Sequence, residues 1–519
     1  MGLQMQVTGR WASLNPLASA GRSWRRLRRR PRAMQLRTVL ILLAIVVGLV
    51  AWLALAPSGA GGSGGAAGAA EPKLAAAASG TPVSQASTSD RGVSKTTINV
   101  VFPVVAVNGE AAQFGFSTDV EFNEQSNAIH LYVDQINKAG GINGRKINAM
   151  IVDFNPTNNA SMQALCRQWT QGSPSVFAVV DGVGTWIEDN QLCVTQQGQT
   201  PLISAWSTTT NWTQLGSPYL WWTGPDQAPV LAATVKWGLS SGRLGQGKKV
   251  GVVVSDQAGD QSALKNYLMP DLKAAGITPQ VATVAGNPDA SAQTNSDAQL
   301  AVERFKAAGV QSVFPLIPEN AFFPYLSAET SQQYFPKLLL SDYESSIEVA
   351  LGLIPVPYET ALDGQEGVTT ETLGGYDDNR PESKGGYDPG VRSCYNTWHA
   401  YHPKPIPGEK TPTPFIEEQG PIQAWCGAVR LFATAAKDAG PDLNRRTFVT
   451  AMSKITNYPG TLSPVWSFGP NKMYGPTQYQ VVKIHNNVPP SSQCKLKTNH
   501  QPQGTCWVTI QPFKPLPAG

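Results

Sequence analysis

Short apolar runs rich in Val and Ile alternate with amphipathic stretches from Thr97 onward, and this alternation most narrows the folds open to the chain. It is typical of βαβ units that build a mostly parallel sheet. Four strands with crossover helices are therefore expected by residue 204. The expected strands are 98–103, 146–153, 175–180 and 200–204, and the expected helices are 120–138, 160–169 and 187–197.

A second set of the same kind begins after residue 222. Two sets of comparable size predict an α/β protein with two doubly wound parallel-sheet lobes joined by hinge crossovers. Such folds bind ligands at the carboxyl ends of their strands, in the crevice between the lobes. In this second set we expect helices at 228–239, 261–275 and 297–308, and strands at 249–255, 278–284, 312–316 and 337–341.

The last third of the chain is less regular. Residues 375–420 are rich in Gly, Pro and charge, which indicates an inserted loop, and helices are expected at 422–439 and 445–454. Strands are expected at 465–468 and 479–484. On this basis the lobes are expected to divide the chain as 96–222 with 342–464, and 223–341 with 465–519.

The N-terminal region differs in kind from the rest. Residues 1–37 form a basic flank, and an apolar run follows at 38–56. About 18 apolar residues can span a bilayer, with the basic flank kept in the cytoplasm. A cleaved secretory signal is the alternative, although Pro57 directly follows the small residues that would form the cleavage site. Both interpretations predict an exported protein, either anchored to the cytoplasmic membrane or secreted, with 57–95 as a flexible Gly/Ala/Ser linker.

Charge and cysteine content fit an exported protein. Residues 71–519 contain 31 basic and 36 acidic residues, so this part offers no basic face suited to nucleic acid. All six cysteines lie in this part, where disulfides can form. Six cysteines allow 15 pairings. Pairing of neighbours is the simplest: Cys166 with Cys193, Cys394 with Cys426, and Cys494 with Cys506.

One short run carries a family resemblance. Residues 136–147 read Ile-Asn-Lys-Ala-Gly-Gly-Ile-Asn-Gly-Arg-Lys-Ile, and the glycines allow a helix to end and a strand to begin within a few residues. This run resembles the helix-turn-strand signature of type I periplasmic binding proteins, in the leucine/isoleucine/valine-binding branch of ABC transporter substrate-binding proteins. The resemblance covers most of 97–487. It implies a small-molecule ligand held between two lobes and an ABC permease that receives it.

The resemblance also implies first-lobe ligand contacts. In that family, hydroxyls and backbone N–H groups after the strands hold the ligand carboxylate, and Thr185 and Thr208, next to Ser207, match these positions. Both threonines could equally be helix caps. Phe114 matches an aromatic wall of the pocket. Two indoles depart from the family and are expected to reshape the pocket, which disfavours branched-chain amino acids and suits aromatic or cationic ligands: Trp186 and Trp206.

Second-lobe contacts are implied at three loops. The family has an aromatic residue after the strand at 249–255, where this chain has Asp256, and another after 312–316, where it has Glu319. An acidic residue pairs with the ligand ammonium in the family, and Tyr343 takes that place in the simplest alignment. Asp342 is adjacent to it and could supply the acidic group.

No catalytic triad, paired catalytic carboxylates or metal-ligand set occurs at suitable spacing, so we expect no enzyme activity and no cofactor. Ser240 lies in a G-x-S-x-G pattern, but that motif requires a strand-to-helix turn, and a helix end is expected here. The expected function is capture of a small polar solute, an amino acid or related compound, for a permease. The alternative is a membrane-anchored sensor that acts through a partner protein.

Overall fold

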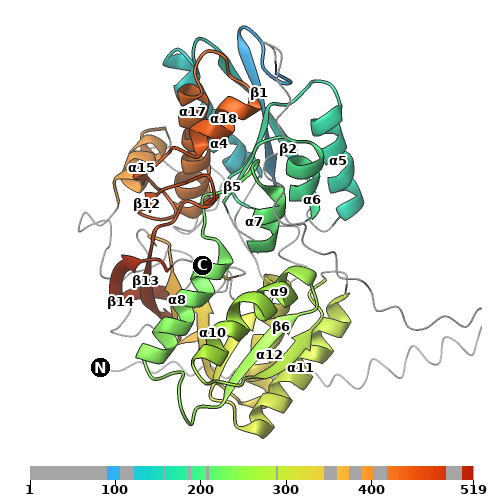
Figure 1. Ribbon diagram of the computed structural model, residues 1–519, viewed down its shortest axis with the longest axis vertical. Helices are drawn as coiled ribbons and strands as arrows, with labels where there is room; N and C mark the ends of the chain where they lie inside the picture. The colour runs from blue at the N-terminus through green and yellow to red at the C-terminus, as the bar shows by residue number, and fades with distance from the viewer. Residues whose placement is uncertain are drawn as a thin grey trace, which may run out of the picture. The chain divides into compact units, whose positions relative to one another are not determined.

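The computed structural model forms two compact units, residues 1–81 and 82–519, and every residue whose structure is described belongs to the second. The helices and strands of this unit are drawn in Figure 1. The described residues are 90–105, 122–155, 158–184, 186, 189–205, 210–287, 290–343, 359–372, 388–401, 418–486 and 505–517.

The first sheet is parallel throughout, with the order β2-β1-β3-β4-β5. Successive side chains of its strands point to opposite faces, and both faces are apolar, as a parallel sheet covered by helices requires. Ile98, Val100 and Phe102 pack on one side, whereas Val101 packs on the other. The strands are β1 (Thr97–Val104), β2 (Lys146–Asp153), β3 (Ala178–Asp181), β4 (Leu202–Ser204) and β5 (Leu220–Trp222).

Helices from two distant parts of the chain cover this sheet. Figure 1 shows α5 on one side and α4, α17 and α18 on the other, and the two apolar cores divide in the same way. The N-terminal helices are α4 (Phe122–Lys138), α5 (Asn159–Gln171), α6 (Asp189–Leu192), η2 (Cys193–Gln197) and α7 (Thr210–Gly216). The returning helices are α15 (Pro389–Tyr401), η9 (Glu418–Trp425), α17 (Cys426–Asp438) and α18 (Arg445–Met452), beside the short strand pair β11 (Tyr458–Pro459) and β12 (Val465–Trp466).

The second sheet has the order β14-β13-β10-β9-β8-β6-β7. Its strands from β6 to β10 are parallel, whereas β13 is antiparallel to both β10 and β14. The edge strand β14 carries Pro512 and Pro515, and proline discourages further strand pairing at an edge. The strands are β6 (Val250–Ser255), β7 (Gln280–Val284), β8 (Ser312–Leu316), β9 (Lys337–Ser341), β10 (Glu366–Thr369), β13 (Gln478–Asn486) and β14 (Thr505–Pro515).

The second sheet is also covered on both faces. One core contains α8 and α10, and the other contains α11 and α12, as Figure 1 also shows. The helix α8 is buried over most of its circumference, and its Trp237 is only 2% exposed. The helices are α8 (Gln227–Ser240), α9 (Ala258–Ala263), η3 (Leu264–Leu268), α10 (Met269–Ala274), α11 (Ser291–Ala308), α12 (Glu319–Gln332) and α14 (Glu359–Leu362).

The chain passes between the sheets three times, near residues 223–226, 370–372 and 475–477. The first crossover is bonded to α7, because the Thr210 hydroxyl bonds to the Asp226 carboxylate and accepts the Ala228 N–H at 3.1 Å. The third is closed by Lys472, whose ammonium donates to four carbonyls of residues 467–476, among them that of Tyr474 at 2.5 Å.

The second and third crossovers lie further along the chain than the lobe boundaries that were expected at residues 342 and 465. Strand β10 pairs with β9, so residues 366–369 extend the second sheet instead of returning to the first lobe at 342. The first apolar core includes Trp466, Phe468 and Met473, although residues after 464 were expected in the second lobe. Pairing and packing at long range decide both limits.

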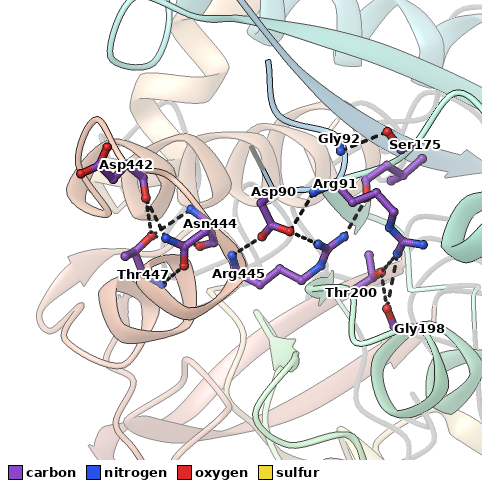
Figure 2. A network of polar contacts seen from close by, with 11 residues as sticks. Asp90, Arg91, Gly92, Ser175, Gly198, Thr200, Asp442, Asn444, Arg445 and Thr447 are labelled. Atoms are coloured by element: carbon purple, nitrogen blue, oxygen red, sulfur yellow. Dashed lines mark hydrogen bonds and ion pairs between the residues drawn. The ribbon is translucent and has the colours of Figure 1, made fainter. Parts of the chain in front are cut away.

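The first described residues are joined to the amino edge of the first sheet, where strands begin (Figure 2). The Asp90 carboxylate accepts the Arg445 backbone N–H at 2.6 Å and forms an ion pair with the Arg445 guanidinium. The same guanidinium donates to the Val176 carbonyl, and Arg91 donates to the Thr200 hydroxyl, just before β3 and β4 respectively. The expected linker therefore meets the lobe at the edge opposite the carboxyl ends of the strands.

Two of the expected disulfides are present. Cys166 on α5 bonds to Cys193 on η2, and Cys394 on α15 bonds to Cys426 on α17. Each bond therefore joins two helices of the first lobe. The third expected pair stays a prediction, because Cys494 lies outside the described residues and the side chain of Cys506 is not described.

Two other expectations concern helices. Ser240 is the last residue of α8 and its hydroxyl donates to the Trp237 carbonyl, so the G-x-S-x-G pattern ends a helix as expected. No helix in the described part of the chain is long and apolar enough to cross a membrane. The expected anchor at 38–56 lies outside that part and stays a prediction.

Glu329 is the most unusual residue of the second core. It lies on α12 with none of its surface exposed, among apolar side chains such as Phe322 and Leu326. Burial raises the pKa of Glu329 well above its usual range, because an apolar core disfavours the ionised carboxylate. At pH values between the usual pKa of Glu and this raised pKa, the folded protein holds a proton that the unfolded chain releases.

Replacing Glu329 tests this proton linkage. An unfolded Glu ionises above about pH 4.3, so wild-type stability falls as the pH rises from there toward the raised pKa of the folded state. The Glu329→Gln variant lacks this loss, which amounts to about 1.4 kcal/mol for each unit by which the pKa is raised. We expect its melting temperature to gain on the wild type between pH 5 and pH 8. Glu303→Gln, at an exposed site on α11, is the control, and equal pH profiles for all three proteins would contradict the assignment.

Candidate functional site

The carboxyl edges of both parallel sheets carry the candidate site, because loops after neighbouring strands meet there. Several expected ligand residues of the first lobe lie outside the described residues and stay predictions: Phe114, Thr185, Trp206, Ser207 and Thr208. The other expected residues, Trp186 in the first lobe and Asp256, Glu319, Asp342 and Tyr343 in the second, are described.

Asp181 organises the loop after β3. It is the last residue of the strand, is fully buried, and its carboxylate accepts the backbone N–H groups of Gly184 and Trp186, each at 2.8 Å. The Asp181 carbonyl also accepts the N–H of Ala205, after β4. One side chain therefore holds the loop that was expected to contact the ligand. An Asp that ends an apolar strand and precedes Gly-x-Gly was the available sequence signal.

Trp186 has a different role from the expected one. Its indole lies in an apolar core, with ring centroids 4.5 Å from Trp169 and 5.2 Å from Phe154. The indole N–H donates to the Asn190 carbonyl at 2.9 Å. This placement corrects the expectation of a pocket wall: the loop turns so that the large apolar ring packs into the core, where its area is removed from water.

Trp425 supports the same loop from the other face of the sheet. Its ring is fully buried, packs edge-on against Phe102, and donates its N–H to the Gln125 side chain at 3.2 Å. Gln125 in turn donates to the Val105 carbonyl at the exit of β1. A Cβ on Gly182 would lie 2.5 Å from the Trp425 ring, so only glycine fits this close approach.

A buried chain of hydroxyls and a carboxylate joins two strand ends in the second lobe. Asp260, in the first turn of α9, accepts from the Ser255 hydroxyl at the end of β6 and from the Tyr343 hydroxyl after β9, each at 2.5 Å. Burial raises the pKa of Asp260 to about 6. Tyr343 is only 1% exposed, so its hydroxyl serves this internal link. Asp260 was not among the site residues expected from the sequence.

Asp342 connects the end of β9 to the second crossover. Its Oδ2 accepts the Thr370 backbone N–H and the Thr370 hydroxyl, each at 2.7 Å. Its Oδ1 is buried and lacks a partner with hydrogen-bond geometry among the described residues. Burial raises the pKa of Asp342 to about 6, since the residue is only 5% exposed.

Asp256 and Glu319 lie after the neighbouring strands β6 and β8, and both loops contact the loop that follows β7. Asp256 is exposed and accepts the Gly286 N–H at 2.9 Å, while the Gly286 carbonyl accepts from Gln257 and Asn320. Glu319 begins α12, and its Oε1 is buried without a hydrogen-bond partner in the described part of the chain. Burial raises the pKa of Glu319 to about 7.

The site is therefore a set of polar loops held in place by carboxylates at the ends of neighbouring strands. Its described residues can accept hydrogen bonds and attract positive charge. Across the described ranges, no group of three or more His, Cys, Asp and Glu side chains could hold a metal ion. The site as described is suited to binding.

Comparison with known proteins finds a family model that matches part of the chain and solved structures of similar fold. Residues 115–352 match the model of a family described as "Periplasmic binding protein". The chain has the fold of a type I periplasmic binding protein. No curated protein sequence matches it closely.

Solved structures of such binding proteins are similar in fold. A fatty acid ABC transporter substrate-binding protein from Thermomonospora curvata is 17% identical, with a TM-score of 0.56 over 82% of this chain and 94% of its own. A solute-binding protein of an ABC transporter from R. palustris, in complex with 4-hydroxybenzoate, is 15% identical, with a TM-score of 0.58 over 81% and 98%. A possible leucine/isoleucine/valine-binding protein from Rhodopirellula baltica is 14% identical, with a TM-score of 0.54 over 75% and 94%.

The contact between Gly182 and Trp425 can be tested by adding one methyl group. Gly182→Ala forces the Trp425 ring or the loop to shift, so we expect a loss of about 1–3 kcal/mol of folding free energy, measured by denaturant unfolding. Gly469→Ala is the matched control, since a Cβ there meets its nearest atom at 3.6 Å, an ordinary contact distance. Equal stability of the two variants would mean that the loop is not packed against this ring.

Proposed function

We propose that this protein is an extracytoplasmic solute-binding protein that captures a small polar solute between its two lobes and delivers it to an ABC-type permease. The observation that carries the proposal is the pair of carboxyl edges, where five acidic side chains hold loops from neighbouring strands in defined positions: Asp181, Asp226, Asp256, Asp260 and Asp342. A preformed set of polar groups lowers the ordering cost of binding a small molecule.

The ligands of similar proteins support a small solute. The R. palustris protein holds 4-hydroxybenzoate, the Thermomonospora curvata protein is described as binding fatty acid, and a similar protein from Desulfitobacterium hafniense holds Leu. These molecules differ widely in shape. The family fold therefore tolerates different ligands, and the residues at the edges must select among them.

Motion between the lobes fits the crossovers. A few residues of each crossover connect the two sheets, and closure about such short segments is a known way to enclose a ligand. The first crossover is also bonded to the first lobe, since Thr210 on α7 bonds to Asp226 and Ala228 at the start of α8. We infer that these contacts set the resting position from which the lobes close.

The N-terminal region completes the proposal. An apolar run at 38–56 behind a basic flank would place the folded unit outside the cytoplasmic membrane, either anchored or released after cleavage. The linker would then meet the first lobe at Asp90, on the edge away from the candidate site. A ligand could enter while the protein stays tethered close to a permease.

Binding can be tested by thermal shift. We expect at least one solute from a panel of amino acids, amides, amines, short peptides and aromatic acids to raise the melting temperature of the full chain, followed by its tryptophan fluorescence. At a hundredfold excess over Kd the stabilisation would be about 2.7 kcal/mol. If a cooperatively melting protein gains no stability from any class, solute capture is the wrong function.

Asp342 can then be tested with the solute found. Asp342→Asn keeps an oxygen that can accept from Thr370 but removes the charge, so a cationic solute should bind several-fold more weakly and an uncharged one nearly as before. Asp134→Asn, on the exposed side of α4, is the control for a lost negative charge. Equal weakening by both variants would remove Asp342 from the site.

A further inference from the structure

The charged side chains in the loops that directly follow the parallel strands are acidic, and Lys472, which closes the third crossover, is a buried cation that interacts with Asp226. The described residues that follow the parallel strands are 153–155, 181–184, 204–205, 223–226, 255–260, 285–287, 317–320, 341–343 and 370–372, and we call them the edge segments. They contain eight acidic residues and no Lys, Arg or His: Asp153, Asp181, Asp226, Asp256, Asp260, Glu319, Asp342 and Glu371.

Several backbone donors in the described edge segments bond to carboxylates of the chain itself. A ligand carboxylate is commonly held by backbone N–H groups at loops and helix starts. Here five such groups donate to carboxylates of the chain itself, which removes them from any ligand. Asp181 accepts from Gly184 and Trp186, Asp226 from Ala228, Asp256 from Gly286, and Asp342 from Thr370.

Helix electrostatics explains only part of this pattern. Carboxylates favour helix N-termini, which accounts for Asp226 as the N-cap of α8 and for Asp260 and Glu319 in first turns. Asp181 and Asp342 cap no described helix, and both hold loops. The negative charge of these carboxylates acts on a ligand as well, whatever structural role each carboxylate has.

Two buried acceptors await a donor. Oε1 of Glu319 has no hydrogen-bond partner in the described part of the chain, and Oδ1 of Asp342 has none with full hydrogen-bond geometry there, although the Thr369 hydroxyl interacts with the Asp342 carboxyl group. Asp342 is nine-tenths buried or more. A buried acceptor without a partner is costly, whereas a positively charged donor would satisfy both its hydrogen bond and its charge. A ligand carboxylate would meet the same oxygens with repulsion.

We propose that the solute is an amine or other cation without a free carboxylate. This inference rests on the proposed function, because it concerns the same site. It separates this protein from similar ones that hold 4-hydroxybenzoate or Leu, both of which carry a carboxylate. The first-lobe loop that would accept such a group instead contains Asp181, and the second lobe presents Asp342 and Glu319 to the positive charge.

Matched pairs of compounds test the charge preference directly. Each pair differs only in the carboxylate: agmatine with arginine, phenethylamine with phenylalanine, and isoamylamine with leucine, with phenylacetate and 4-hydroxybenzoate as anions. We expect at least one amine to raise the melting temperature of the full chain while its amino acid and the anions do not. Stabilisation by an amino acid or an anion in preference to the amines would overturn the inference and leave solute capture standing. No stabilisation by any compound, in a chain that melts cooperatively, would reject both.

The variant Asp256→Asn tests whether the charge of an edge segment contributes to amine binding, apart from the effect of losing a negative charge elsewhere on the protein. Asp256→Asn retains an acceptor for the Gly286 N–H and loses only the charge, so it should fold normally. We expect its affinity for the stabilising amine to fall about fivefold, the effect of one charge near a cation in a watery site. Asp134→Asn on α4 should bind as the wild type does. An unchanged affinity in Asp256→Asn, or an equal loss in Asp134→Asn, would contradict a role for the edge charge.

Discussion

Parallel pairing of strands is the constraint on which the site depends. Because neighbouring strands of the first sheet, and β6 to β10 of the second, run in the same direction, every connecting helix returns the chain to the amino edge. All the loops that leave the strands therefore lie at one edge of each sheet. Ser255 and Tyr343 are far apart in sequence, yet both bond to Asp260 for this reason.

Buried carboxylates give those loops their shape. Burying a carboxylate is costly, and the cost is offset only when hydrogen bonds replace water. Asp181 meets this condition with two backbone donors of the loop that follows it, and Asp342 does so with the backbone N–H and the hydroxyl of Thr370. The bonds of Asp181 fix the shape of one loop, whereas those of Asp342 connect two segments that are distant in sequence. Under the proposed function, a preorganised edge of this kind would favour ligands of matching charge.

Much of the fold was predictable, because the spacing of apolar residues along the sequence shows which side of a helix or strand is buried. Strands β2, β8 and β9 begin and end at the expected residues, and the first two disulfides join the expected cysteines. Helix α12 was not predicted, because its apolar residues do not recur at the spacing of an amphipathic helix. Its buried side chains include Phe322, Phe323, Tyr325 and Leu326. Strand β10 is four residues long, and only its pairing with β9 and β13 makes it a strand. The insertion at 375–420 also contains a helix, α15, although this segment was expected as a loop.

The sequence by itself determined the fold class, the number of lobes and the acidic character of the loops, since these follow from apolar spacing and from residue identity. Tertiary structure alone decided which atoms those acids contact. Trp186 packs into the core instead of lining a pocket because its large ring is more stable away from water. Asp260, which local pattern does not distinguish from ordinary loop residues, became central because strand pairing brought the distant Tyr343 hydroxyl within hydrogen-bond distance of it.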